Sequence, residues 1–187
     1  MRDYPWRLLT RDYPWYGVVT STDDLQQGDF IEKCLFFPPP EDIPLFEIVD
    51  ESDIEVKPER YNVIVLSQSC DIKFKKIRFI VVCPYWSLSS FQKEYPYYGE
   101  DDGFEELRRG NTVGYRLLSK CDIPQFKREA VVASFREVYS LPFRWLINSM
   151  STYGVRLRLL PPYREHLSQE FARFFMRVGL PDDIAFD

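Results

Sequence analysis

Residues 63–72, with the sequence VIVLSQSCDI, place a dense group of reactive side chains directly after an apolar run. The group consists of Ser67, Gln68, Ser69, Cys70 and Asp71. Proteins use hydroxyl, thiol and carboxylate groups as nucleophiles and general bases. The apolar run is continuous rather than alternating, which predicts a strand that is covered on both faces. Because loops at strand ends carry many functional sites, the segment predicts a turn that borders a site.

Three interpretations of this turn remain open. In the first, Asp71 caps the turn while Ser67 and Ser69 bond to nearby backbone N–H groups. In the second, the side chains contact a ligand or RNA. In the third, Cys70 is a nucleophile, which requires a neighbouring base that favours the thiolate form. The only histidine in the sequence, His166, is the one candidate for that base.

The composition is that of one folded domain. The chain has 187 residues, of which 45% are hydrophobic and 17% aromatic, and this predicts an aromatic-rich core. The formal net charge of -5 argues against broad, non-specific attraction to nucleic acid, but it leaves room for a local basic groove.

The cysteines predict free thiols and no metal site. Cys34, Cys70, Cys83 and Cys121 form no C-x-x-C pair, and a single histidine cannot complete a zinc site of closely spaced ligands. We therefore expect neither a metal nor another cofactor. The sequence has no apolar segment of signal-peptide type and no run near the ~20 residues of a membrane span. We expect a protein of the reducing cytoplasm that has no contact with a membrane.

The arrangement of predicted elements favours a mainly β fold. Strands are predicted at residues 30–37, after a turn at Gly28-Asp29, and at 63–66, 79–83, 113–118 and 130–135. Residues 155–160 form either a last strand or the lead-in to a helix, and short helices are predicted at 104–109 and 141–149. A clearer helix follows Pro161-Pro162, with an apolar face of Leu167, Phe171, Phe174 and Val178. This pattern predicts a small, strongly curved β-barrel that is covered by the C-terminal helix.

Two regions are expected along the chain. Residues 1–26 contain a doubled RDYPW motif and form an N-terminal aromatic arm, and residues 27–187 form a single barrel domain with its C-terminal helix. The arm either packs on the domain or docks a partner, because Tyr and Trp are favoured at interfaces.

Four short motifs occur along the predicted strands, at Gly28-Asp29-Phe30-Ile31, Val65-Leu66-Ser67, Val82-Cys83-Pro84 and Arg136-Glu137-Val138. In this order they resemble the MazF/PemK-type toxin family, whose members are small SH3-like barrels with outer helices. The resemblance runs from about Gln27 to Pro181. The chain also resembles uncharacterised bacterial proteins that share QGD, LSQSCD and YREHLSQ…FFMRVGLP.

The family resemblance implies a sequence-selective endoribonuclease that needs no metal, is usually a homodimer and is controlled by an antitoxin. RNA cleavage by transesterification needs a base for the 2′-hydroxyl, a cation for the phosphate and an acid for the leaving oxygen. The candidate catalytic residues are Arg60, Asp71, Ser87 and His166. The candidate binding residues are Ser67, Gln68, Ser69, Cys70, Arg136 and Arg164.

The sequence departs from the family pattern at two places. Tyr61-Asn62 follow Arg60 where the family has proline. The family has Thr or Ser directly after the proline of the third strand, whereas here Tyr85-Trp86 stand between Pro84 and Ser87. Three functions therefore stay open: an endoribonuclease, a barrel that binds protein or nucleic acid without catalysis in a defence or toxin–antitoxin setting, and a thiol hydrolase that uses Cys70 and His166. Convergence of the four candidate catalytic residues on one groove would favour the first.

Overall fold

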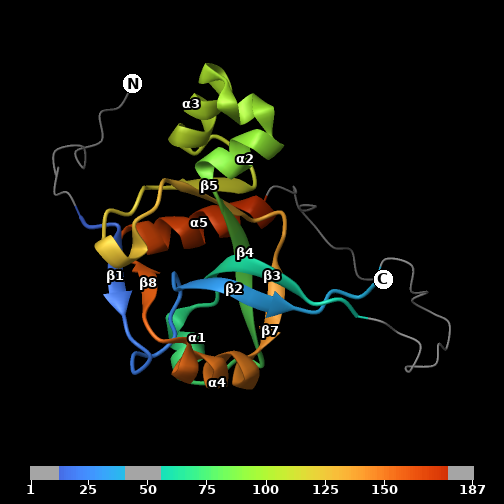
Figure 1. Ribbon diagram of the computed structural model, residues 1–187, viewed down its shortest axis with the longest axis vertical. Coiled ribbons are helices and arrows are strands. Elements are labelled where there is room, and N and C mark those ends of the chain that lie inside the picture. The colour runs from blue at the N-terminus through green and yellow to red at the C-terminus, as the bar shows by residue number, and fades with distance from the viewer. Residues whose placement is uncertain (1–12, 41–55, 177–187) are drawn as a thin grey trace, which may run out of the picture.

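The computed structural model describes residues 13–40 and 56–176, and Figure 1 shows their arrangement. Within these ranges the protein is a mixed α/β structure in which every strand pairing is antiparallel. The strands are β1 (Tyr16–Val19), β2 (Phe30–Phe36), β3 (Glu59–Val65), β4 (Phe79–Ser87), β5 (Tyr115–Leu118), β6 (Val131–Ser134), β7 (Tyr139–Pro142) and β8 (Arg156–Leu159). The α-helices are α1 (Ser69–Lys73), α2 (Leu88–Glu94), α3 (Asp101–Arg109), α4 (Phe143–Tyr153) and α5 (Tyr163–Phe175), with 3-10 turns η3 (Pro96–Gly99) and η4 (Pro124–Phe126).

The long strand β4 organises the larger sheet. Along one edge it pairs with β3, and along the other its first half pairs with β7 and its second half with β6. The resulting order is β2-β3-β4-β6-β5, with β7 beside β4. A second sheet of two strands, β1 and β8, joins the larger one through a bridge between Asp29 and Arg158.

The continuous apolar runs of β3 and β4 are explained by two separate cores. Ile64 and Cys83 belong to one hydrophobic cluster, whereas Val63 and Val82 belong to another, and all four side chains are fully buried. Successive residues of a strand point to opposite faces, so a strand between two cores has no polar face. The prediction of strands that are covered on both faces is confirmed.

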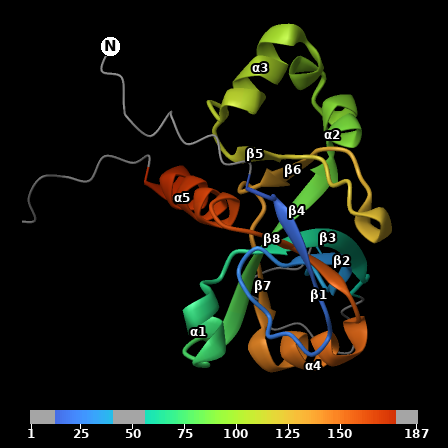
Figure 2. The same ribbon diagram turned by 90° about the vertical axis from the view of Figure 1, so that its left-hand side faces the viewer.

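The barrel prediction is met only in part. Among the described residues, β2 and β5 end the six-stranded sheet and do not pair with each other, so the sheet does not close into a barrel. The prediction of a C-terminal helix over the strands is confirmed, because Leu167 of α5 is fully buried in the first core. The fold also contains more helix than a mainly β protein, and Figures 1 and 2 show α2 and α3 projecting beyond β5.

The helices α1 and α2 were not predicted. The segment after β3, expected to be a turn, instead begins a short helix at Ser69–Lys73. Helix α2 follows β4 directly, and the Ser87 side chain accepts a hydrogen bond from Ser90 N at its start. Helices of five and seven residues are too short to show a clear helical period in the sequence.

The part of the N-terminal region that is described is joined to the rest of the fold. Residues of β1 lie in the range 1–26 that was expected to form an arm, and β1 pairs along its length with β8. Trp15, from the second RDYPW copy, stacks on Tyr163 with ring centroids 3.6 Å apart. The first copy and Val178 of the predicted helix face lie outside the described residues.

Candidate functional site

Three segments that are far apart in the sequence meet at a polar hollow of about 340 Å³. We call it the strand-end pocket, because it lies where the chain leaves β3, beside the loop before β2 and the start of α5. It is lined by Gln27, Gln68, Ser69, Cys70, Arg164, Glu165, Ser168 and Gln169. These residues come from the QGD, LSQSCD and YREHLSQ motifs, so the structure brings together the three motifs that the sequence analysis singled out.

The serines of the LSQSCD motif hold the end of β3 in place. Beyond the last residue of the strand, Leu66 N donates to Val81 O (2.8 Å), and Ser67 Oγ accepts from Val81 N (2.8 Å). Ser69 Oγ accepts a hydrogen bond from Gln27 N (3.1 Å), which joins the start of α1 to the loop before β2. Ser67 therefore has a structural role, while Ser69 both supports and lines the pocket.

The QGD motif forms the inner wall of the pocket. Gln27 is buried, and its Nε2 donates to Leu66 O (2.7 Å). Gly28 has a φ of 83°, and a Cβ there would lie 3.1 Å from Leu159 Cβ, so both the turn and its close packing favour glycine. Gly28 also donates its N–H to Val65 O and accepts from Leu159 N, which connects β3 to β8 at this loop.

Asp29, the third residue of this motif, anchors the loop through two arginines that the sequence analysis did not identify. Its carboxylate is fully buried and accepts from Nε of Arg156 (2.7 Å) and from Nε and Nη2 of Arg158. The Arg156 guanidinium also donates to the backbone oxygens of Thr20, Asp23 and Asp24. Buried charges of this kind are tolerated when they are paired and hydrogen-bonded. The only sequence signal was the alternation of arginine and leucine in residues 155–160.

Arg164 supplies the positive charge of the strand-end pocket. Its Nη2 lies 2.6 Å from Oε1 of Glu165, and its side chain keeps 23% of its surface exposed. Glu165 Oε2 is buried and has no hydrogen-bond partner among the described residues. The thiol of Cys70 is exposed and lies 3.8 Å from Asp71 Oδ1. The pocket thus combines the Arg164–Glu165 ion pair with amide, hydroxyl and thiol groups, a set that offers both donors and acceptors to a polar, hydrogen-bonding ligand.

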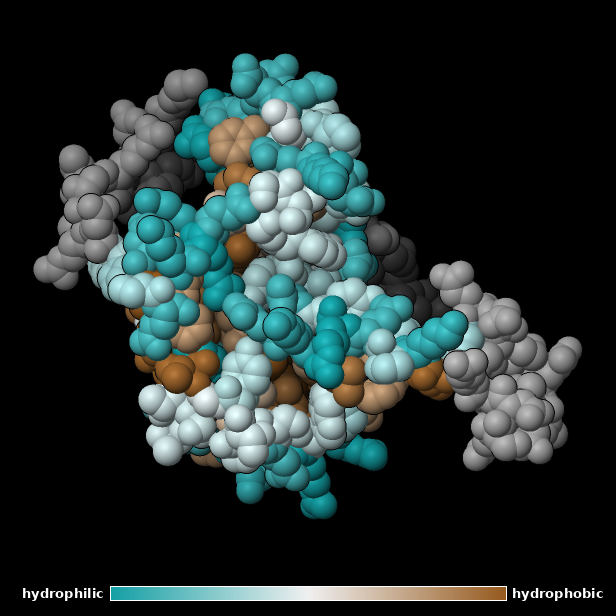
Figure 3. Space-filling model, in the orientation of Figure 1, coloured by the Kyte–Doolittle hydropathy of each residue, from teal (hydrophilic) through white to brown (hydrophobic). Residues whose placement is uncertain are grey.

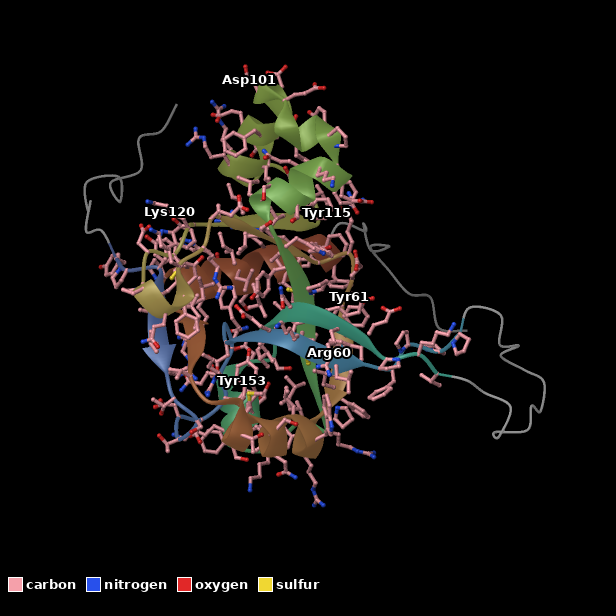
Figure 4. The ribbon with its side chains drawn as sticks, viewed as in Figure 1. Arg60, Tyr61, Asp101, Tyr115, Lys120 and Tyr153 are labelled. Atoms are coloured by element: carbon pink, nitrogen blue, oxygen red, sulfur yellow. The ribbon has the colours of Figure 1, made fainter. Side chains whose placement is uncertain are left out.

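Arg60 and Ser87 lie far from this pocket. Arg60 is near the start of β3, where it donates to Lys33 O (3.1 Å), and Figure 4 shows it beside Tyr61. At about 3.3 Å per residue, the length of β3 puts it roughly 20 Å from Ser67. Ser87 ends β4 and caps α2, and a similar length of strand separates it from Val81, the residue that contacts Ser67.

His166 and Asp71 are closer to the pocket but do not line it. The exposed His166 ring meets the edge of Tyr163, with centroids 6.3 Å apart. Asp71 lies on α1, with its carboxylate 3.9 Å from Lys76 Nζ. The four candidate catalytic residues therefore do not converge on one groove, and the pocket lining does not pair Cys70 with His166.

Arg136 also lies elsewhere, with its guanidinium 4.8 Å from the centre of the Tyr115 ring and its Nη2 donating to Val113 O. Of the candidate binding residues, Gln68, Ser69, Cys70 and Arg164 meet in the strand-end pocket.

Comparisons of the chain with protein-family models, with curated proteins and with solved structures found no match. Within residues 13–40 and 56–176, no cluster of three or more His, Cys, Asp or Glu side chains could hold a metal ion. No helix in the same part of the chain has the length and apolar character needed to cross a membrane.

Proposed function

We propose that this protein is a MazF/PemK-like binding module that holds single-stranded RNA in the strand-end pocket without cleaving it. The observation that carries the proposal is a contrast between two sets of residues. Four of the candidate binding residues line one open hollow, whereas the four candidate catalytic residues are spread over β3, α1, β4 and α5.

The chemistry of the pocket supports a nucleotide as the ligand. The Arg164 guanidinium donates from Nε and Nη2 to Glu165 Oε1 and can offer its remaining N–H groups to a phosphate. The amides of Gln27, Gln68 and Gln169 offer both donors and acceptors to a base edge. Its volume of about 340 Å³ is at the small end of ligand pockets, which run from about 300 to 1,000 Å³. An unstacked base of a single strand is the form of RNA that proteins read in this way.

The positions of the candidate catalytic residues argue against cleavage at this pocket. A general base or acid must come within about 2.6–3.2 Å of the atom that it serves. Arg60, Ser87 and His166 do not line the pocket, so a phosphate held by Arg164 would lack the groups that transesterification requires. Endoribonuclease activity stays a prediction of the family resemblance, and a cleavage assay tests it directly.

A relation to the SH3-like barrels despite the open sheet, the cytoplasmic location, the homodimer and the antitoxin or other protein partner also belong to this proposal. They rest on the family resemblance and on the defence or toxin–antitoxin setting that it implies. Light scattering of the purified protein tests the dimer, and a monomer at all accessible concentrations would contradict it.

The test measures binding and cleavage on the same RNA. Fluorescence anisotropy with a labelled single-stranded RNA of mixed sequence should show binding that Arg164→Gln weakens about tenfold, because a charged hydrogen bond contributes roughly 1.5–3 kcal/mol. Arg173→Gln is the matched control, since Arg173 lies on the same helix but pairs with Glu170 away from the pocket.

A denaturing gel of the incubated RNA completes the test. We expect intact RNA. Cleavage that Asp71→Asn or Arg60→Ala abolishes in a folded protein would replace this proposal with the endoribonuclease. A folded protein that binds no RNA would contradict both.

A further inference from the structure

We propose that a second site on this protein, a basic groove beside α4, binds the phosphate backbone of the RNA strand whose base occupies the strand-end pocket. This inference rests on the proposed function and extends it to a second surface. The basic groove has a volume of about 840 Å³ and lies between residues 75–79 and the first two turns of α4. Its lining includes Lys75, Ile77, Arg78, Phe79, Arg144 and Ile147.

The groove carries an excess of positive charge in an acidic protein. Lys75, Arg78 and Arg144 line it and form no ion pair with any described residue. Lys73, at the end of α1, and Lys76, in the following loop, are close to Lys75 in the sequence. Helix α4 contains no acidic residue, and the one carboxylate on α1 is Asp71, near Lys76. In a chain with a net charge of -5, such a cluster raises the local concentration of a polyanion.

Exposed aromatic rings lie among these cations. Phe74 and Phe79 expose 64% and 51% of their surface, and the Nζ atoms of Lys73 and Lys76 lie 5.9 and 5.6 Å from the centre of the Phe74 ring. Alternating cations and aromatic rings are the features that bind single-stranded nucleic acid, because the cations follow the phosphates and the rings stack with bases.

The backbone fixes the two walls of the groove relative to each other. Phe143 N, at the start of α4, donates to Arg78 O (2.9 Å). Strand β7, which leads into α4, pairs with the first half of β4, which follows Arg78. Backbone hydrogen bonds therefore hold in place the segments that carry the cations. Figure 3 shows strongly hydrophilic side chains at the end of the molecule below α4.

Helix α1 links the basic groove to the strand-end pocket. Ser69 and Cys70, at its start, line the pocket, and Lys75 and Arg78 follow its end. A helix of five residues is about 7.5 Å long, so one RNA strand can cross α1 and reach both sites. Figure 2 shows α1 below α5 and beside α4, the position that this path requires.

The shape of the surface favours RNA over a membrane. A peripheral membrane anchor presents a projecting apolar face to the lipid. Here Ile77, Phe143 and Ile147 line a hollow, and a flat bilayer does not enter a groove. A single strand of RNA does, and its charge complements the groove.

The test combines three substitutions in the groove with a salt titration. Lys75→Gln, Arg78→Gln and Arg144→Gln together should weaken binding of the labelled RNA at least tenfold at low salt. The slope of log K against log salt concentration should fall by about 2, since each lost phosphate contact to a single strand removes about 0.7. The control replaces Lys93, Lys120 and Lys127, which are exposed elsewhere, with Gln and should leave the slope nearly unchanged.

The outcomes separate this inference from the proposed function. If the wild type binds no RNA, the proposed function and the groove inference both fail. Suppose instead that the wild type binds RNA and that Arg164→Gln weakens binding whereas the groove variant does not. In that case only the groove inference fails. If only the groove variant weakens binding, the groove binds RNA but the strand-end pocket does not, and the proposed path of one strand across both sites fails.

Two further measurements keep the test decisive. Circular dichroism verifies that the triple variant is folded, and if it is not, Arg144→Gln alone should lower the slope by about 0.7. Sedimentation with phosphatidylserine vesicles tests the membrane alternative. Vesicle binding that the groove variant loses, without any change in RNA binding, would overturn the inference.

Discussion

The Asp29 carboxylate and the Arg156 guanidinium lie 2.7 Å apart although 127 positions separate them in the sequence, and neither side chain is exposed. Arg158 reaches the same carboxylate from the next position on the same face of β8. The pair joins β8 to the turn that carries Gln27, and so it positions one wall of the strand-end pocket.

Asp29→Asn should destabilise the protein by about 3–5 kcal/mol, because it leaves two buried guanidinium groups without their negative partner. Urea-induced unfolding measures the change. Asp122→Asn is the control, since its pair with Lys120 is solvent-exposed and should contribute little. Equal stability of the two variants would show that the buried pair does not hold the fold.

Ser87→Ala should lower the unfolding free energy by about 1 kcal/mol, because it removes the side-chain cap of α2. RNA binding by the folded protein should stay as in the wild type. A variant that is as stable as the wild type but no longer binds RNA would instead show that Ser87 belongs to the functional site.

Gly103→Ala should destabilise the projecting helices by about 1–3 kcal/mol. A Cβ at this position would lie 2.1 Å from the Tyr97 carbonyl oxygen, which is backbone and cannot move aside cheaply. Gly99→Ala is the matched control, because its Cβ would lie 3.8 Å from its nearest neighbour, in ordinary contact. Thermal unfolding of the two variants should therefore differ clearly, and similar melting temperatures would contradict the close approach of α3 to η3.

Leu167→Ala should cost about 2–5 kcal/mol, since this fully buried side chain fixes α5 to the core. Phe171→Ala should cost less, because Phe171 is only partly buried against the same core. Urea unfolding distinguishes them, and a larger effect of Phe171→Ala would contradict the packing of α5.

The four thiols should differ in reactivity toward a thiol reagent in the native protein. Cys70 is exposed and should react first, while Cys34, Cys83 and Cys121 are buried and should react after unfolding. Burial raises the pKa of the Cys34 thiol to about 11 and also raises the pKa of Cys83. Rapid labelling of a second thiol in the folded protein would contradict this order.

The same pKa shift predicts a loss of stability at alkaline pH. The Cys34 pKa rises from 9.0 to about 11 on folding, so the unfolded chain releases this proton first as the pH increases. The contribution is complete below pH 9.0 and is lost as the pH rises toward 11. Cys34→Ala should flatten the decline in unfolding free energy across this range, and an unchanged slope would contradict the shift.

The elements that could be predicted from the sequence are those whose signals are local. The apolar runs of β3 and β4 and the helical period of α5 each lie within one segment. Most of their described apolar residues are buried, although Phe79 is exposed and Phe171 is only partly buried. Helices α1 and α2 are only five and seven residues long and follow directly after strands, so their sequences do not show a helical period. Closure of the sheet depends on pairings between distant strands, which local patterns do not determine.

The candidate site likewise contains parts that could be predicted from local sequence and parts that could not. The turn after β3 and the start of α5 were expected to lie together, and Cys70 and Arg164 now line one pocket. Arg60 and Ser87 were grouped with them through the family resemblance, but an extended strand separates each from the pocket. Asp29 and its arginines went unrecognised because nothing in either segment indicates a partner so far away in sequence.

The pairing of β1 with β8 determines when β1 can enter its sheet during synthesis on the ribosome. Among the described strands, β1 has no other partner, so Tyr16–Val19 must wait until residues up to Leu159 have been synthesised. At about 5–20 residues per second, this leaves β1 as an open edge for roughly 7–28 seconds. During that time Asp29 also lacks both of its arginines. A nascent chain that stalls before β8 would therefore present an unpaired strand to its neighbours on the polysome, which makes it a substrate for chaperones rather than a partly working protein.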